Sequence, residues 1–236
     1  KIEEIDEKSR TITVQSGVIL EDAITSVNEK NLMLPLNFGA KGSAQIGGIV
    51  STNAGGLRVL RFGMARNLIL GIEAVLSNGE IISSMKKITK DNSGYDIKQL
   101  FIGSEGTLGI ISKVILKLEE KPSSRFSALV GLANYENVIN FLKFMQKGLS
   151  GSLSGFELIW GETYKAMRDS SVEYSSLLDS NFPYYVIIEL LGSDSDNDYK
   201  RLSELIYLAI EKNIIMDALL AQNERELKLI WNLRED

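Results

Sequence analysis

Alternating apolar and polar positions predict strands in the first half of the chain. Thr11–Gln15 alternates as a half-buried strand does, and Ile110–Leu118 is an apolar run typical of another strand. Ile69–Leu76 and Glu80–Ser83 flank the turn sequence Ser77-Asn78-Gly79, so they predict a hairpin. The Asn-Gly pair predicts a type I′ turn, because such a turn needs positive φ at its two central residues.

Helical spacing in the first half is confined to short segments. Glu21–Lys30 predicts an amphipathic helix with Ala23, Ile24 and Val27 facing inward. Asp96–Phe101 predicts a helical turn.

The second half alternates strand-like and helix-like segments. Strands are predicted at Phe126–Leu132, Pro183–Leu191 and Ile214–Leu220, and helices at Tyr135–Lys147 and Asp198–Lys212. The fold class is therefore α+β, and this alternation is compatible with a ferredoxin-like sandwich. The acidic run Asp194–Asp198 resembles a calcium loop only superficially, since it lacks the glycine and the final glutamate of an EF-hand. A solvated helix start is the favoured interpretation.

A final helix is predicted after Asn223, a good N-cap, with Glu226 at the position of a capping-box carboxylate. Leu227, Ile230, Trp231 and Arg234 then share one face. Arg234 lies on or beside this apolar stripe, where its planar fork would suit a carboxylate ligand. The alternative is that Arg234 extends into solvent at the helix C-terminus and interacts with the helix dipole.

Two glycine-rich segments carry the candidate chemistry. Residues 43–56 hold four glycines among Ala, Ser and apolar residues, and residues 103–109 form the sequence Gly-Ser-Glu-Gly-Thr-Leu-Gly. Neither segment is a Walker loop or a Rossmann dinucleotide motif. Glycine allows a ligand to approach the backbone closely, so we expect both segments to enclose one phosphate-bearing or flat aromatic cofactor. Tight turns and close internal packing are the alternative. Arg58, Arg61 and Arg66 follow the first segment and would suit a cofactor phosphate, although solvated surface arginines are the simpler interpretation.

Composition divides the chain at Glu119–Ser124, a linker-like segment. Residues 1–122 carry a net charge of +1 and residues 123–236 a net charge of −6. We therefore expect two domains, 1–122 and 123–236. The overall net charge of −5 argues against a nucleic-acid partner, and no apolar run is long enough for a transmembrane helix.

Cysteine and histidine are both absent from the 236 residues. This excludes disulfides, the usual zinc ligands, a Ser-His-Asp triad and covalent flavin attachment through these side chains within the sequence. The lack of cysteine gives weak support to a cytoplasmic location.

The motifs together resemble the FAD domain of the vanillyl-alcohol oxidase/p-cresol methylhydroxylase superfamily. They are Pro35-Leu36, Gly39–Gly48, Thr52–Gly56, Arg61–Gly63, Gly94–Asp96 and Gly103–Ile111. The most similar branch contains D-lactate dehydrogenase, the glycolate oxidase flavin subunit and D-2-hydroxyglutarate dehydrogenase. In the second half, Gly155–Leu158 resembles a cap-domain motif of this family, and Trp231–Glu235 resembles its substrate-side helix.

The resemblance implies the second part of a PCMH-type FAD-binding domain followed by an incomplete ferredoxin-like α+β cap domain. FAD would be bound non-covalently, with Arg234 on the substrate carboxylate. Residues implied to contact the flavin ring and ribityl chain are Ser43, Ala44, Gly47, Gly48, Thr52, Asn53 and Gly56. Those implied near the pyrophosphate or adenine are Pro35, Leu36, Gly39 and Ala40, and those completing the pocket are Gly106, Gly109, Ile110 and Ile111.

The implied activity is oxidation of a D-2-hydroxy acid (D-lactate, glycolate or D-2-hydroxyglutarate) to the 2-oxo acid, with hydride transfer to flavin N5. We expect the chain to be part of a larger enzyme and to bind FAD poorly alone. Relatives carry an upstream Pro-Arg-Gly-Gly-type loop and downstream histidines that help to hold a divalent metal, and neither occurs here. The electron acceptor stays open, and a homodimer is one expected assembly. The alternative function is a non-catalytic FAD- or nucleotide-binding module, or a scaffold subunit of an oxidase complex.

Overall fold

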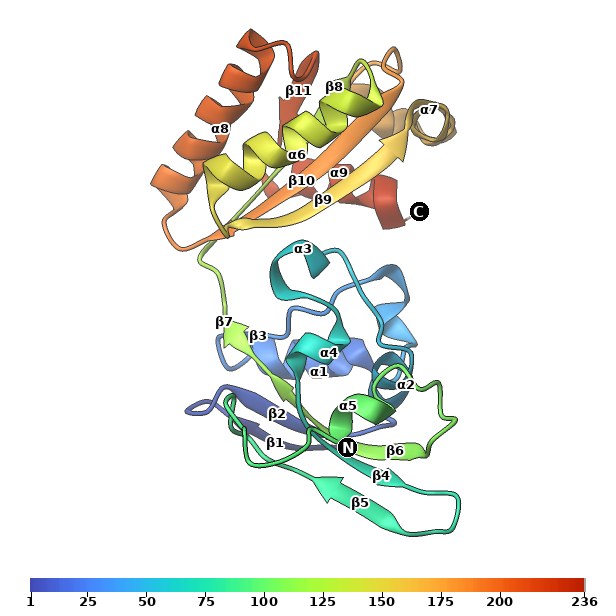
Figure 1. Ribbon diagram of the computed structural model, residues 1–236. Coiled ribbons are helices and arrows are strands. Elements are labelled where there is room, and N and C mark those ends of the chain that lie inside the picture. The colour runs from blue at the N-terminus through green and yellow to red at the C-terminus, as the bar shows by residue number, and fades with distance from the viewer. Residues whose placement is uncertain (236) are drawn as a thin grey trace. The chain divides into compact units, whose positions relative to one another are not determined.

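The computed structural model describes residues 1–235 and divides the chain into two compact units, Lys1–Lys121 and Pro122–Asp236 (Figure 1). Each unit has its own hydrophobic core. No helix in the described part of the chain is long and apolar enough to cross a membrane.

Unit 1 is built on an antiparallel sheet with strand order β1-β2-β6-β4-β5 (Figure 1). Its strands are β1 (Ile2–Asp6), β2 (Thr11–Gln15), β4 (Ile69–Val75), β5 (Ile81–Ser84) and β6 (Ile110–Lys117). A separate pair joins β3 (Leu32–Met33) to β7 (Glu119–Glu120). The predicted strands at 11–15, 69–76 and 110–118 are therefore confirmed.

Short helices cover one face of this sheet (Figure 1). They are α1 (Leu20–Asn28), η1 (Gly39–Gly42), α2 (Ile46–Ser51), α3 (Val59–Phe62), α4 (Ala65–Leu68) and α5 (Lys98–Phe101). In α2, Ile46, Ile49 and Val50 are buried at helical spacing. Part of the first glycine segment is thus a helix, because burial of these side chains outweighs the low helix propensity of glycine.

The predicted hairpin forms between β4 and β5, but its turn is not type I′. Gly79 has a φ of +85°, whereas Asn78 is not among the described residues with positive φ. The Gly79 N–H donates to the Leu76 carbonyl at 3.0 Å, and the Leu76 N–H donates to the Glu80 carbonyl at 2.8 Å. Ser77 and Asn78 are therefore the central residues of the turn, and only Gly79, which follows them, adopts the left-handed conformation.

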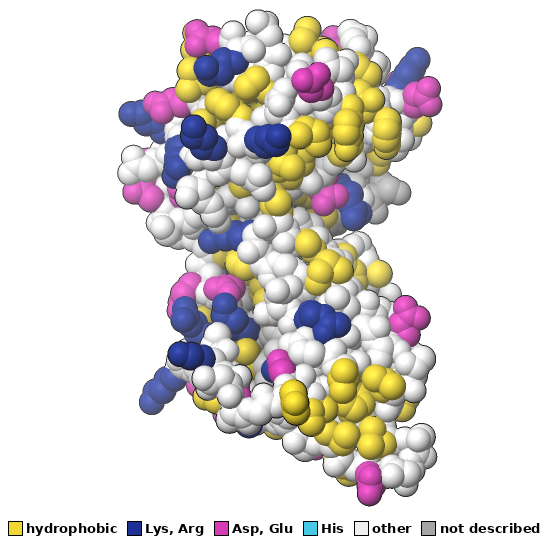
Figure 2. All heavy atoms as spheres, in the orientation of Figure 1, with side chains coloured by type: hydrophobic (Ala, Val, Ile, Leu, Met, Phe, Trp, Pro, Cys, Tyr) yellow, Lys and Arg dark blue, Asp and Glu magenta, His cyan; other side chains and the backbone are white. Residues whose placement is uncertain are grey.

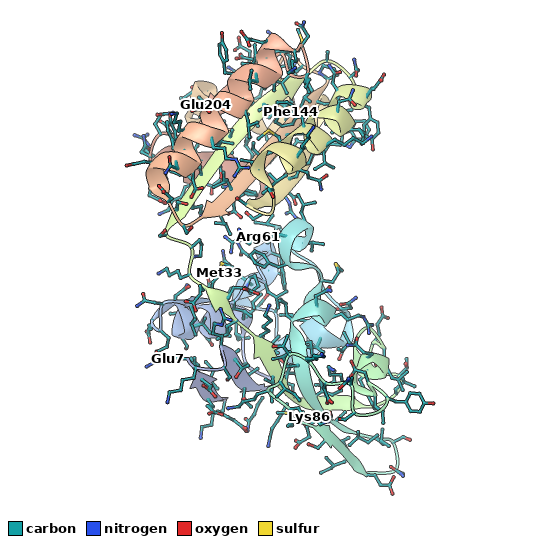
Figure 3. The ribbon with its side chains drawn as sticks, turned by 60° about the vertical axis from the view of Figure 1, so that its left-hand side comes forward. Glu7, Met33, Arg61, Lys86, Phe144 and Glu204 are labelled. Atoms are coloured by element: carbon teal, nitrogen blue, oxygen red, sulfur yellow. The ribbon has the colours of Figure 1, made fainter. Side chains whose placement is uncertain are left out.

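Unit 2 has the βαββαβ order of a ferredoxin-like fold, with sheet order β11-β8-β10-β9 and antiparallel pairing throughout. Its strands are β8 (Ser124–Leu132), β9 (Leu153–Trp160), β10 (Tyr184–Gly192) and β11 (Asp217–Leu220). Helices α6 (Tyr135–Leu149) and α8 (Ser195–Glu211) cover one face of the sheet (Figure 1). Phe144 on α6 and Glu204 on α8 mark these two helices in Figure 3.

The other face of this sheet is covered by α7 (Gly161–Ser170), η2 (Val172–Ser176) and α9 (Glu224–Glu235). The Tyr164 and Tyr185 rings stack there with centroids 3.7 Å apart. The α9 cap forms as predicted at its first residue, because Asn223 Oδ1 accepts the Glu226 N–H at 3.0 Å. The Glu226 carboxylate reaches back one residue further than expected and accepts the Gln222 N–H at 2.8 Å.

Candidate functional site

The two glycine-rich segments lie side by side in unit 1. The Gly103 N–H donates to the Val50 carbonyl at 3.1 Å, and the Glu105 N–H donates to the Ser51 carbonyl at 2.8 Å. Both acceptors lie in the last turn of α2. Direct backbone hydrogen bonds therefore join the two segments, and the expectation that they enclose one cofactor stays a prediction.

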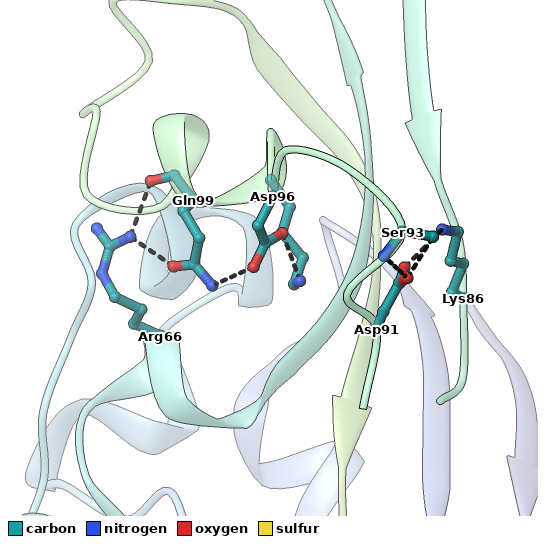
Figure 4. A network of polar contacts seen from close by, with 7 residues as sticks. Arg66, Lys86, Asp91, Ser93, Asp96 and Gln99 are labelled. Carbon is teal, nitrogen blue, oxygen red and sulfur yellow. Dashed lines mark hydrogen bonds and ion pairs between the residues drawn. The ribbon is translucent and has the colours of Figure 1, made fainter. Parts of the chain in front are cut away.

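Arg66 ties both segments to α5. Its backbone N–H donates to Asn53 Oδ1 at 2.9 Å, and its Nη1 donates to the Gln99 carbonyl at 2.8 Å and to Gln99 Oε1 at 2.7 Å (Figure 4). Its Nη2 donates to the Ile102 carbonyl, directly before Gly103. The half-buried guanidinium thus satisfies internal carbonyl groups, which explains this arginine without a cofactor phosphate.

The Arg66 network continues to Asp96 through Gln99, whose Nε2 donates to Asp96 Oδ2 at 3.1 Å (Figure 4). Lys98 donates to the other carboxylate oxygen at 2.6 Å. Burial raises the pKa of Asp96, but the hydrogen bonds from Lys98 and Gln99 outweigh this effect and hold the pKa below its usual value. The carboxylate is therefore ionised at neutral pH and anchors α5.

The glycines of the first segment fall into two kinds. A Cβ on Gly47 would lie 2.6 Å from Ser16 Cβ, and one on Gly56 would lie 2.2 Å from the Asn37 carbonyl oxygen. These two glycines are required by packing within the unit. Gly48, and Gly39 shortly before the segment, are exposed, with nothing within 4 Å of where a Cβ would stand. Open backbone at these positions fits a ligand that approaches the main chain closely.

The second segment shows the same division. Gly106 has a φ of +78°, and a Cβ there would meet only Ile110 Cδ1 at 4.0 Å, whereas one on Gly109 would lie 2.8 Å from the Val75 carbonyl oxygen. The side chains of Leu108 and Ile110 are 50% and 68% exposed. Hydrophobic side chains gather on this part of unit 1, around α5, β5 and β6, in Figure 2. An apolar surface beside open backbone suits a flat aromatic ring.

The remaining predicted contact residues differ in exposure. Ser43, Ala40 and Thr52 are exposed, and Ala44 and Asn53 are half-buried. Pro35, Leu36 and Ile111 are buried, with Leu36 and Ile111 in the unit 1 core. Any contact by the buried side chains would depend on backbone atoms or on movement, and all of these assignments stay predictions.

Arg58 and Arg61 each have partners within unit 1. Arg58 Nη1 lies 3.6 Å from the Met33 sulfur, and the Arg61 guanidinium lies over the Phe62 ring, 4.9 Å from its centroid (Figure 3). Neither of these two contacts is with an anion, and a phosphate contact by either arginine stays a prediction.

In unit 2, the two family-like motifs meet through an ion pair. Arg234 Nε on α9 donates to Glu157 Oε2 on β9 at 2.9 Å. The two side chains are 39% and 25% exposed. Arg234 therefore lies at the edge of the apolar stripe of α9, whose members Leu227, Ile230 and Trp231 are buried. Neither a role for Glu157 nor the strand β9 was predicted from the sequence.

A second polar group lies on the same sheet face. Glu189 on β10 is 1% exposed and accepts from Arg125 Nε at 2.8 Å and from Ser154 Oγ at 2.7 Å. Trp231 Nε1 donates to Ser127 Oγ at 2.9 Å. Glu189 lies opposite Gly155, and Glu157 lies opposite Ile187, so the two glutamates occupy neighbouring rows of the sheet. This buried group was not predicted from the sequence, and strand alternation across β8, β9 and β10 is the signal that could have indicated it.

Comparison with solved structures first gives the class of fold. Over its full length the chain superposes on alkyldihydroxyacetonephosphate synthase with a TM-score of 0.73 at 16% identity, covering 44% of that chain. A second structure of this synthase gives a TM-score of 0.71, also at 16% identity, with 93% of this chain and 42% of that chain covered. The fold expected from the sequence motifs, part of a PCMH-type FAD-binding domain followed by an α+β cap domain, is confirmed.

The chain belongs to the FAD-linked oxidases. Residues 1–84 match the FAD binding domain family, and residues 121–236 match the family of FAD linked oxidases, C-terminal domain. It is 43% identical to the Schizosaccharomyces pombe protein named "Putative D-lactate dehydrogenase C713.03, mitochondrial", over 100% of this chain and 44% of that protein. It is 37% and 39% identical to the mitochondrial D-2-hydroxyglutarate dehydrogenases of Arabidopsis thaliana and Bos taurus, covering 42% and 41% of their lengths. The chain thus spans less than half the length of these relatives.

Proposed function

We propose that this chain is part of an FAD-dependent dehydrogenase that oxidises a D-2-hydroxy acid to the 2-oxo acid. The observation that carries the proposal is the ion-paired Arg234, half-exposed on the helix that resembles the substrate-side helix of this family. The identities of 43% and 39% to proteins named as D-lactate and D-2-hydroxyglutarate dehydrogenases support the same substrate class.

We propose that the open backbone of unit 1 holds the flavin. The contacts would come from the exposed main chain at Gly39 and Gly48, from Ser43 and Thr52, and from the Gly106–Ile110 segment. When bound, FAD supplies a two-electron acceptor for hydride removed from C2 of the substrate. The exposed apolar side chains of Leu108 and Ile110 would exclude water from the face of the ring.

In this proposal Arg234 binds and orients the substrate carboxylate. A guanidinium presents several N–H donors in one plane, which match the two oxygens of a carboxylate. Holding the carboxylate restricts the substrate to one orientation, and positioning of this kind contributes several kcal/mol to many enzymatic rates, on the order of 7 or more in favourable cases.

We propose D-lactate, glycolate or D-2-hydroxyglutarate as the substrate. We also propose that the chain consists of two domains, 1–122 and 123–236, that the protein forms a homodimer and that it passes electrons to a separate acceptor.

The location of the protein has two candidates. The sequence predicts a cytoplasmic location, whereas the names of the relatives favour a mitochondrial one. Cell fractionation with a tagged full-length protein would distinguish the two locations.

The test is anaerobic reduction of the flavin in the purified full-length protein. Addition of D-lactate, glycolate or D-2-hydroxyglutarate should bleach the flavin absorption at about 450 nm, while the L-enantiomers of the two chiral acids should not. A bound flavin that none of these acids reduces would contradict the proposal and favour the non-catalytic FAD module.

A further inference from the structure

We propose that Glu157 is a positioning residue that orients the guanidinium of Arg234 for an anionic substrate. This inference rests on the proposed function, because it assigns a task to the carboxylate that contacts the proposed substrate arginine. The Arg234–Glu157 pair joins the last turn of α9 to β9.

The pair engages only one edge of the guanidinium. Arg234 donates from Nε to Glu157 Oε2 at 2.9 Å, and no other ion pair of Arg234 is described within residues 1–235. The two Nη groups complete the planar fork, and no hydrogen bond from them is described within residues 1–235. An arginine can hold one carboxylate through Nε and present its Nη donors to a second one.

The side chains of Arg234 and Glu157 differ in conformational freedom. Arg234 is a long side chain that is 39% exposed, and an arginine without a partner loses rotamer entropy when a ligand fixes it. Glu157 extends from a strand paired with β10, opposite Ile187, whose side chain is fully buried. The sheet therefore provides a fixed anchor, and the anchor removes part of the ordering cost before the substrate arrives.

The neighbouring carboxylate, Glu189, is engaged elsewhere and does not pair with Arg234. The next carboxylate on the same sheet face, Glu189, is 1% exposed and accepts from Arg125 and Ser154. Glu189 is therefore already hydrogen-bonded in the sheet, whereas Glu157 is directed to Arg234.

The test separates orientation from charge in the full-length, FAD-containing protein. Glu157→Ala removes the anchor and should raise KM for the best D-2-hydroxy acid, and Kd for its 2-oxo product by calorimetry, each by about tenfold. Glu157→Gln keeps an oxygen that accepts from Nε, so both values should stay within about threefold of the parent. If Glu157→Ala does not fold, Glu157→Asp, which retracts the carboxylate by one methylene, replaces it with the same expectation.

Asp179→Ala is the matched control, because it breaks another arginine pair of unit 2, Arg168–Asp179 at 3.1 Å, whose two members lie outside both α9 and β9. This control should leave KM and Kd unchanged. The double variant Glu157→Ala/Arg234→Ala should be no worse than Arg234→Ala alone, since an anchor without its arginine has nothing to orient.

Each outcome decides between the two proposals. If Arg234→Ala raises KM and Kd while Glu157→Ala leaves them unchanged or lowers them, the positioning role is wrong and the proposed function stands. If Arg234→Ala changes neither value although the acid reduces the flavin, both the carboxylate role of Arg234 and the role of Glu157 are wrong. If no D-2-hydroxy acid reduces the flavin of the unmodified protein, the proposed function itself fails.

Discussion

At the scale of single residues, the glycines divide into those that packing requires and those whose backbone is open to a ligand. Gly47, Gly56 and Gly109 are fixed by close contacts within unit 1, while Gly39 and Gly48 have open space where a side chain would stand. Both glycine segments could be located from the sequence, but the packed glycines could not be distinguished from the open ones. That distinction depends on residues far away in the sequence, such as Asn37 and Val75.

This separation gives opposite predictions for two glycines of the same segment. Gly48→Ala should raise the free energy of unfolding by about 0.5–1 kcal/mol, because alanine favours the helix and nothing obstructs its methyl group. If Gly48 faces the cofactor, the same methyl group should weaken FAD binding by about tenfold. Chemical unfolding and FAD titration of the full-length protein would measure the two effects.

Gly56→Ala should instead destabilise unit 1 by about 1–3 kcal/mol, since its Cβ would overlap the Asn37 carbonyl oxygen. Gly17→Ala is the control, because Gly17 is exposed, has nothing within 4 Å and lies outside the predicted contacts. Unchanged FAD affinity in Gly48→Ala would remove Gly48 from the cofactor site.

At the scale of elements, periodicity located most helices and strands, and the failures have identifiable causes. β9 was not predicted, because Ser154, Gly155 and Glu157 interrupt its apolar pattern; these residues lie in a strand whose other face joins the core through Phe156 and Leu158. α2 was not predicted either, since local propensity disfavours glycines in a helix. The Arg66 network and the Arg234–Glu157 pair join residues far apart in sequence, so no local pattern reports them.

The stacked pair Tyr164 and Tyr185 predicts that the stability of unit 2 falls at high pH. Burial raises the pKa of Tyr164 and of Tyr185 above the ordinary value, and Tyr164 donates to the Leu178 carbonyl at 2.6 Å. The unfolded chain ionises these phenols at about pH 10, whereas the folded chain keeps them neutral. The stabilisation is therefore complete below about pH 10 and is lost as the pH rises above it.

Tyr164→Phe should lower the free energy of unfolding by about 1 kcal/mol at neutral pH, through the lost hydrogen bond, and should make the decline above about pH 10 shallower. Urea unfolding at pH values from about 8 to 11 would measure both changes. Tyr135→Phe is the control, because the Tyr135 ring is 53% exposed. An equally steep decline in Tyr164→Phe would show that Tyr164 does not carry the effect.

At the scale of the whole chain, sequence motifs were sufficient to identify the family and the fold class, because glycine positions and the alternation of strands with helices are local signals. Each unit closes a core of its own, with Ile12, Val14 and Leu116 in the first and Val130, Phe141 and Ile188 in the second. The ferredoxin-like sheet of unit 2 pairs only strands from within that unit.

A fragment that begins at Pro122 should therefore fold alone. Its urea unfolding should be a single cooperative transition with a free energy of a few kcal/mol, on the order expected for a small domain. Circular dichroism and fluorescence would follow the transition, and coincident curves from the two probes are the criterion. A fragment without a cooperative transition would show that unit 2 depends on the rest of the protein.

The two tryptophans of this chain differ sharply in their surroundings. The Trp231 indole is 4% exposed and is hydrogen-bonded to Ser127, whereas Trp160 is 59% exposed. A water-borne quencher such as iodide would therefore suppress the emission of Trp160 and spare that of Trp231. Since Trp231 lies one turn before Arg234 on α9, the unquenched fluorescence comes from the helix that carries this arginine, and Trp231 is an intrinsic probe of that helix.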